Sequence, residues 1–207
     1  LGLDKIPREC LFSGDTESFI NPVNGVHNPC LLVIKGIYRD DIKISVGKWE
    51  KYNPILEGMK QFMAEFTKKR RQELYEKLNE HEGENQDIDH FLKKLQGKCC
   101  LKKLQKCLHL EGVKDFVNKK DLTPIIYFHN LGYDVQAFIT TFDPAKRECA
   151  IKKGAVWYSA RFKLFGAEFE LRNSFTIITT ALKNFPKMFL PKEEQERLEK
   201  DSGNSKY

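Results

Sequence analysis

A change in the spacing of apolar residues near position 54 constrains the fold of this chain more than any other feature. Before it, CLLVIKGIY at 30–38 is a continuous apolar run of strand length, and IKISVG at 42–47 alternates with period two. The stretch 9–20 also predicts a strand, and the Asn, Gly and Pro residues of 21–29 predict a turn region. The first part of the chain is therefore expected to form a β-meander with the first strand at its centre.

Helical spacing follows this meander. In 54–80, apolar residues recur at intervals of three and four, and Pro54 suits the first turn of a helix. The segment 88–110 predicts further helix, interrupted at Gly97.

The remainder of the chain mixes the two patterns. It predicts a strand at 124–129, a helix from about 134 to 141 and a hairpin over 155–178 that turns near Phe165 and Gly166, with a helix at 179–189 after them. The pattern as a whole indicates about six strands and four helices in α/β order, with helices flanking a sheet.

Composition leaves several classes of partner open. The chain has 207 residues, enough for one generous domain or two small ones, and no stretch approaches the ~20 apolar residues of a membrane span. The net charge of +6 permits a polyanionic partner, although the basic runs near 68–72, 93–106 and 118–121 are also typical of a solvated helix face. Six irregularly spaced cysteines indicate a reducing, intracellular compartment.

Two acidic residues on the first predicted strand could carry chemistry. Asp15 and Glu17 are two residues apart, so alternation along a strand directs both carboxylates to one face. Paired carboxylates repel each other and favour a divalent cation such as Mg²⁺. By itself, Asp-x-Glu is a weak signal and is far more typical of a solvated strand end.

A second group of polar residues follows the strand at 124–129. Asn130 comes just after the strand, Gly132 lies in a turn and Asp134 stands at the start of a helix. Asp134 could be a third carboxylate facing a metal or could hold a ligand water, and the amide of Asn130 could bind a sugar or phosphate. Flat side chains on which an unpaired base could stack are Tyr127, Phe128, His129 and Tyr133, although Tyr127 and Phe128 are also candidates for the core.

These segments resemble a known family. FSGDTESFI is similar to the first exonuclease motif of family B DNA polymerases, and HNLGYD is similar to the second. The wider phrase LTPIIYFHNLGYDVQAFI resembles the protein-primed subgroup of linear mitochondrial plasmids, adenovirus-like viruses and self-synthesising transposons. LRNSFTIITTALKNFPKMF at 171–189 fits a third element of that subgroup in order and spacing, so the likeness covers roughly 10–35 and 122–190.

The resemblance implies a ribonuclease-H-like exonuclease fold, with a mixed central sheet flanked by helices. We therefore expect 1–207 to be a single, incomplete exonuclease-like domain with a variable helical insertion at about 54–120. The implied function is 3′–5′ proofreading within a DNA-directed DNA polymerase during DNA replication. The implied partners are single-stranded DNA or primer-template and a terminal protein primer, in a mitochondrial plasmid or a nuclear mobile element.

The same resemblance implies roles for individual residues. Two Mg²⁺ (or Mn²⁺) ions would be bound by Asp15, Glu17 and Asp134. The DNA 3′ end would be contacted by Thr16, Ser18, Tyr127, His129, Asn130, Tyr133, Ser174 and Phe175.

The chain departs from the family pattern in three ways. Asn173 stands where the family has Asp, no Tyr is followed by Asp four residues later, and no Asp-Thr-Asp palm motif is present. We therefore expect either a fragment of a longer polymerase or a decayed copy. The alternative function is a non-catalytic nucleic-acid-binding remnant of the same fold, and a chance likeness in an unrelated α/β interaction module is a third interpretation.

A zinc site is a further alternative. Some transposon members of the family carry a Cys/His insertion between the first two motifs, where this chain has Cys99, Cys100, Cys107 and His109. Their spacing does not match paired C-x2-C ligands, which favours buried or incidental thiols over a zinc site.

Overall fold

In the part of the chain that the structure describes, seven strands form one sheet in the order β3-β2-β1-β4-β7-β6-β5. The computed structural model describes residues 6–25, 27–47, 53–142, 150–177, 179 and 191–193. The strands are β1 (Leu11–Ile20), β2 (His27–Gly36), β3 (Lys43–Gly47), β4 (Ile125–Phe128), β5 (Ala150–Lys153), β6 (Val156–Leu164) and β7 (Ala167–Asn173). The helices are α1 (Pro54–Leu78), α2 (Gln86–Gln96), α3 (Leu101–Lys106), α4 (Glu111–Lys114) and α5 (Asp134–Thr141).

The sheet is mixed. β1 pairs antiparallel with β2 and parallel with β4, and β4 pairs parallel with β7. The predicted α/β class, with a mixed sheet flanked by helices, is confirmed. The expectation that the first strand is at the centre of the meander is wrong, because β2 lies between β1 and β3. In the full sheet β1 is an interior strand between β2 and β4. Because β1, β4 and β7 are parallel, their carboxyl ends meet at one edge, which is where open α/β sheets commonly bind ligands.

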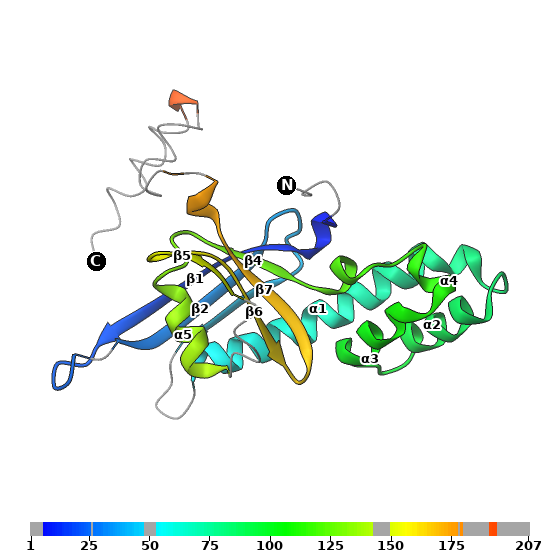
Figure 1. Ribbon diagram of the computed structural model, residues 1–207, viewed down its shortest axis with the longest axis horizontal. Coiled ribbons are helices and arrows are strands. Elements are labelled where there is room, and N and C mark those ends of the chain that lie inside the picture. Colours follow the sequence, from blue (N-terminus) through cyan, green and yellow to red (C-terminus); the bar gives the residue numbers. More distant parts are fainter. Residues whose placement is uncertain are drawn as a thin grey trace.

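One face of the sheet carries the aromatic core. Phe12 of β1 lies edge-on to Phe62 of α1, with ring centroids 4.8 Å apart. Phe138 of α5 contacts Phe128 of β4 and Phe169 of β7, at centroid distances of 5.6 and 6.3 Å. The two helices α1 and α5 therefore cover the same face, and Figure 1 shows α2, α3 and α4 gathered around the second half of α1, beyond the sheet.

Most element boundaries follow from local chemistry that the sequence displays. The Asn53 side chain accepts hydrogen bonds from the amides of Ile55 and Leu56 at 2.9 and 3.2 Å and so caps α1. Gly97 ends α2, as predicted. The β6–β7 turn falls at Phe165 and Gly166, also as predicted, and both residues have positive φ.

Two strands differ from the sequence prediction. β2 begins at His27, inside the stretch predicted as a turn, because the antiparallel ladder with β1 continues to Ile20. β5 was not predicted, because its four residues are all exposed and carry no apolar alternation. The helix predicted over 179–189 lies outside the described residues, apart from Thr179.

A buried ion pair joins the helices to the sheet. The guanidinium of Arg70 on α1 donates to the backbone oxygen of Asp121 at 2.8 Å and to its carboxylate at 3.0 Å. Asp121 lies in the short helix Lys119–Leu122 that leads into β4, and both side chains are buried. The carboxylate also accepts the amide of Asn118 at 2.9 Å, so the pair fixes how the chain enters β4.

Replacing Arg70 by Ala should lower the free energy of unfolding by about 3–5 kcal/mol, because it leaves the Asp121 carboxylate buried and without its partner. Lys69→Ala is the matched control, since the Lys69–Asp41 pair is partly exposed and is expected to contribute less than about 1 kcal/mol. Urea unfolding followed by circular dichroism measures both, and equal losses for the two variants would contradict the assignment.

Candidate functional site

A buried carboxylate connects the two segments that sequence analysis singled out. One oxygen of Asp134 accepts hydrogen bonds from the Thr16 amide at 3.2 Å and from the Thr16 hydroxyl at 2.6 Å. The ladder between β1 and β4 ends at Ser13 and Tyr127, so the Thr16 amide is available to a side chain. The start of α5 is thereby held against β1 at the carboxyl edge of the parallel strands.

Close packing of β1 on β4 depends on Gly14. A Cβ atom at this position would lie 2.5 Å from Phe128 Cζ and 2.7 Å from Ile126 Cγ2, both in buried side chains. A larger residue would push β1 away from β4. The glycine that precedes Asp15 therefore has a packing role.

A hollow of about 300 Å³ lies beside Asp134 on the helix-covered face. The Tyr133 hydroxyl is hydrogen-bonded to Ser18 Oγ and lies 3.1 Å from His27 Nδ1. Tyr133 is 46% exposed, and the His27 ring lies edge-on to its ring with centroids 5.6 Å apart. The residues lining the hollow are Thr16, Ser18, His27, Pro29, Tyr133, Gln136, Ala137 and Thr140.

Asp15 and Glu17 lie on the opposite face of β1. Both are exposed whereas Thr16 between them is buried, which confirms that the two carboxylates emerge together. Neither side chain forms an ion pair or hydrogen bond with another described residue. Both carboxylates are open to solvent, and the buried carboxylate of the site is Asp134.

Burial changes the acidity of Asp134. Desolvation raises its pKa from 3.8 to about 6, the hydrogen bond from Thr16 opposes this change, and the negative charge of Asp15 adds to it. A carboxyl group of this kind exchanges protons close to neutral pH, which is common at functional sites.

The predicted metal ligands do not converge. Asp134 faces Thr16, whereas Asp15 and Glu17 lie on the other face of β1. Among the described residues, no group of three or more His, Cys, Asp or Glu side chains is placed to hold a metal ion. The arrangement thus does not fit a three-carboxylate metal centre as it stands.

The four residues considered as zinc ligands also differ in burial and contact different groups. Cys107 is buried, and its sulfur lies 3.2 Å from Lys94 Nζ and 3.3 Å from the Lys103 oxygen. His109 Nδ1 contacts the Lys106 oxygen instead of a thiol. Cys100 is exposed, and Cys99 Sγ lies 3.6 Å from the Cys100 oxygen.

The other residues predicted to contact a DNA strand lie either in the core or at the carboxyl edge of the sheet. Phe128 is fully buried, and Tyr127 is half-buried in register with Arg172. His129 lies beside two residues of the turn after β7, with its Nδ1 3.2 Å from Ser174 Oγ and its ring 5.3 Å from that of Phe175.

Asn130 occupies an unusual backbone position. It is exposed and has a φ of 61°, a conformation that Asn tolerates better than most residues. Gly132 lies in this turn, as predicted, but does not have positive φ. The residue that needs special backbone chemistry in this turn is therefore Asn130.

Asn173 is a structural residue. It is 3% exposed, its amide nitrogen donates to the Trp157 oxygen at 2.7 Å, and its amide oxygen accepts the Phe175 amide at 3.0 Å. An ionised Asp could accept from Phe175 but could not donate to Trp157. The departure from the family pattern at this position thus matches the local hydrogen bonding.

Sequence reasoning missed His27 and Gln136. His27 was assigned to a turn, and Gln136 is one polar residue in a short helix, so neither carries a local signal. Their place beside Tyr133 follows only from the packing of α5 across β1 and β2.

Comparison with known proteins identifies no relative: no family model matches the chain, and no curated protein and no solved structure matches it. Within the part of the chain that the structure describes, no helix has the length and apolarity needed to cross a membrane.

Asn173→Asp should lower the free energy of unfolding at pH 7 by about 1–3 kcal/mol, because the Trp157 oxygen loses its donor and faces a carboxylate. Asn130→Asp makes the same chemical change at an exposed position and should have a much smaller effect. Thermal and urea unfolding of the two variants are the measurements, and a neutral Asn173→Asp would refute the structural role.

The raised pKa of Asp134 predicts a pH-dependent stability. The folded state binds this proton more tightly than the unfolded chain, so the contribution of Asp134 to the unfolding free energy falls as pH rises from about 4 to about 6. The rise in the pKa of Asp134 from 3.8 to about 6 corresponds to a change in the free energy of unfolding of about 3 kcal/mol.

Asp134→Asn should remove this dependence, since an amide oxygen still accepts from Thr16 but does not ionise. The stability of the variant relative to the parent should therefore increase between pH 4 and pH 7 in urea titrations. Glu17→Gln removes an exposed carboxylate and should leave the pH dependence of stability the same as in the parent. Parallel profiles for Asp134→Asn and the parent would contradict the assigned pKa.

Proposed function

We propose that this chain is the exonuclease-type domain of a protein-primed family B DNA polymerase, and that it holds the unpaired 3′ end of a DNA strand at the carboxyl edge of β1 and β4. The observation that carries the proposal is the pair of hydrogen bonds from Thr16 to Asp134, because they join the two motif-bearing segments. The strand order β3-β2-β1-β4-β7, with β1, β4 and β7 parallel, supports a ribonuclease-H-like fold.

The side chains at this edge suit a single strand. The exposed ring of Tyr133 beside a hollow of about 300 Å³ offers a stacking surface for a base. The hydroxyls of Thr16 and Ser18 and the exposed amide of Asn130 supply hydrogen-bonding groups for sugar and phosphate. On the other side of β1, His129 and Phe175 form a second aromatic pair at the same edge.

Hydrolysis would depend on divalent ions. Mg²⁺ or Mn²⁺, when bound, would supply a hydroxide and stabilise the leaving oxygen. The family resemblance assigns these ions to Asp15, Glu17 and Asp134, but the three carboxylates do not converge, so we derive no hydrolytic step from them.

A second candidate is therefore a non-catalytic domain of the same fold that binds nucleic acid. The separation of the carboxylates and the structural role of Asn173 favour it. For the exonuclease, the family resemblance implies DNA replication from a terminal protein primer, on a mitochondrial plasmid or a nuclear mobile element.

The test is binding and trimming of fluorescein-labelled single-stranded DNA, with the label at the 5′ end. Tyr133→Ala should weaken binding by a factor corresponding to about 1–3 kcal/mol, as expected for loss of one base stack. Tyr38→Ala removes an exposed tyrosine that follows β2 near the amino end of β1, away from this edge, and should leave binding unchanged.

Trimming in Mg²⁺ or Mn²⁺ separates the two candidates. Shortening from the 3′ end that is lost in Asp15→Asn would establish the exonuclease. Binding without shortening would establish the non-catalytic domain. If the parent binds no single-stranded DNA, or if Tyr133→Ala and Tyr38→Ala behave alike, the proposed site is wrong.

A further inference from the structure

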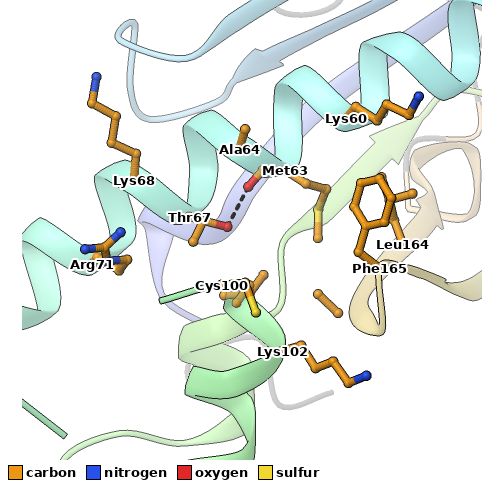
Figure 2. Close-up of a pocket in the computed structure, with 12 residues that line it drawn as sticks. Lys60, Met63, Ala64, Thr67, Lys68, Arg71, Cys100, Lys102, Leu164 and Phe165 are labelled. Carbon is orange, nitrogen blue, oxygen red and sulfur yellow. Dashed lines mark hydrogen bonds between the residues drawn. The ribbon is translucent and has the colours of Figure 1, made fainter. Parts of the chain in front are cut away.

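Two hollows lie side by side around the β6–β7 turn, where the helices meet the sheet. The first, about 280 Å³, is bounded by α1, α3 and this turn (Figure 2). The second, about 430 Å³, lies between α3, the segment Lys119–Leu122 and the same turn, and Lys102 lines both. We call the two hollows together the basic groove, after its cationic residues Lys60, Lys68, Arg71, Lys102, Lys106 and Lys119.

The first hollow has an apolar floor and a charged rim. Met63 of α1, Leu101 of α3 and Leu164 of β6 contribute the floor. Figure 2 shows the lysine and arginine side chains around it, with their charged ends directed outward. Long cationic side chains commonly cover apolar surface with their stems while their charged ends stay in water.

The groove carries unbalanced positive charge. Six cationic residues line it but only one acidic residue, Glu168, which is paired with Lys119 at 2.6 Å. Lys60 is also paired, with Glu57 at 2.6 Å, which leaves Lys68, Arg71, Lys102 and Lys106 without an ion pair among the described residues. Lys68, Lys102 and Lys106 are exposed and form no ion pair with any described residue. Such a concentration of one sign of charge attracts a polyanion.

Phe165 lies at the tip of the turn and lines the first hollow (Figure 2). Its side chain is 73% exposed and its φ is 50°, which is rare for a bulky residue. The neighbouring Gly166 lies directly on Lys102, because a Cβ there would be 2.6 Å from Lys102 Cδ. An exposed aromatic ring held among cations is an arrangement that binds unpaired bases.

We infer that the basic groove binds an unpaired nucleic-acid strand, with a base on Phe165 and phosphates near Lys68, Lys102 and Lys106. A small anion would occupy one hollow, whereas cations spread over two hollows that share Lys102 suit a polymer with repeated charges. The groove lies at the amino end of β7, six residue steps or ~20 Å from Asn173 at the carboxyl end, and so is separate from the site at Asp134.

The test is fluorescence anisotropy of labelled oligo(dT) with the full chain over a range of salt concentrations. Reversing three charges, with Lys68→Glu, Lys102→Glu and Lys106→Glu together, should weaken binding at least tenfold. It should also reduce the magnitude of the slope of log K against log salt by about 2, since each phosphate contact in a single strand contributes roughly 0.7. The matched control reverses Lys43, Lys114 and Lys153, which are exposed and lie outside the groove, and should change affinity less than threefold.

Phe165 separates base stacking from simple charge attraction. Phe165→Ala should weaken oligo(dT) binding at least fivefold with the salt slope unchanged, and Phe165→Trp should retain binding. Heparin, a polyanion without bases, should bind the parent and Phe165→Ala equally well.

Three outcomes would overturn the inference. They are equal effects of the two triple variants, oligo(dT) binding that does not respond to Phe165→Ala, and groove-dependent binding of vesicles rich in anionic phospholipid in place of oligo(dT). The inference fails independently of the proposed function, because the charge reversals test the groove whereas Tyr133→Ala tests the edge near Asp134.

Discussion

The described structure depends on one-sided burial of its sheet. Helices α1 and α5 cover one face with phenylalanines, so residues along β1 alternate between an apolar environment and an open one. Phe12 and Thr16 face the helices, whereas Asp15 and Glu17 face away. This alternation decides what each acidic residue can do. It leaves Asp15 and Glu17 exposed, and it places Thr16 where the start of α5 brings a third carboxylate.

Asp134 illustrates how a site can oppose stability. Its carboxyl group is buried and therefore resists ionisation, yet hydrogen bonds from Thr16 hold it at the edge where β1 separates from β4. A buried group that ionises near neutral pH is costly to a small domain and is commonly retained where function requires it. The Arg70–Asp121 pair contributes at a distance, since it fixes the segment that enters β4 and hence the position of the turn that carries Asn130 and Tyr133.

The sequence predicted the elements well where local signals were strong. Apolar spacing indicated β1, β3, β4, α1 and α5 with small errors at their ends, and the hairpin pattern around Phe165 and Gly166 indicated the β6–β7 turn. It failed at β5, whose four exposed residues carry no alternation, and at the start of β2, where ladder formation outweighed the turn-forming residues. It identified Asp15, Glu17 and Asp134 as a group but could not show that Asp134 faces Thr16, because that orientation depends on where α5 crosses the sheet.

The sequence alone determined the α/β order, the shared face of Asp15 and Glu17, and the placement of polar residues directly after β4. These are local properties, set by side-chain periodicity and turn chemistry within a few residues. Only the tertiary structure decided that Asp134 is buried against Thr16 and that the Asn173 amide donates to the Trp157 oxygen. It also decided that lysines from α1, α3 and the segment before β4 line one groove with Phe165. Each of these involves residues far apart in the chain, and their contacts exist only because the helices pack on one face of a twisted sheet.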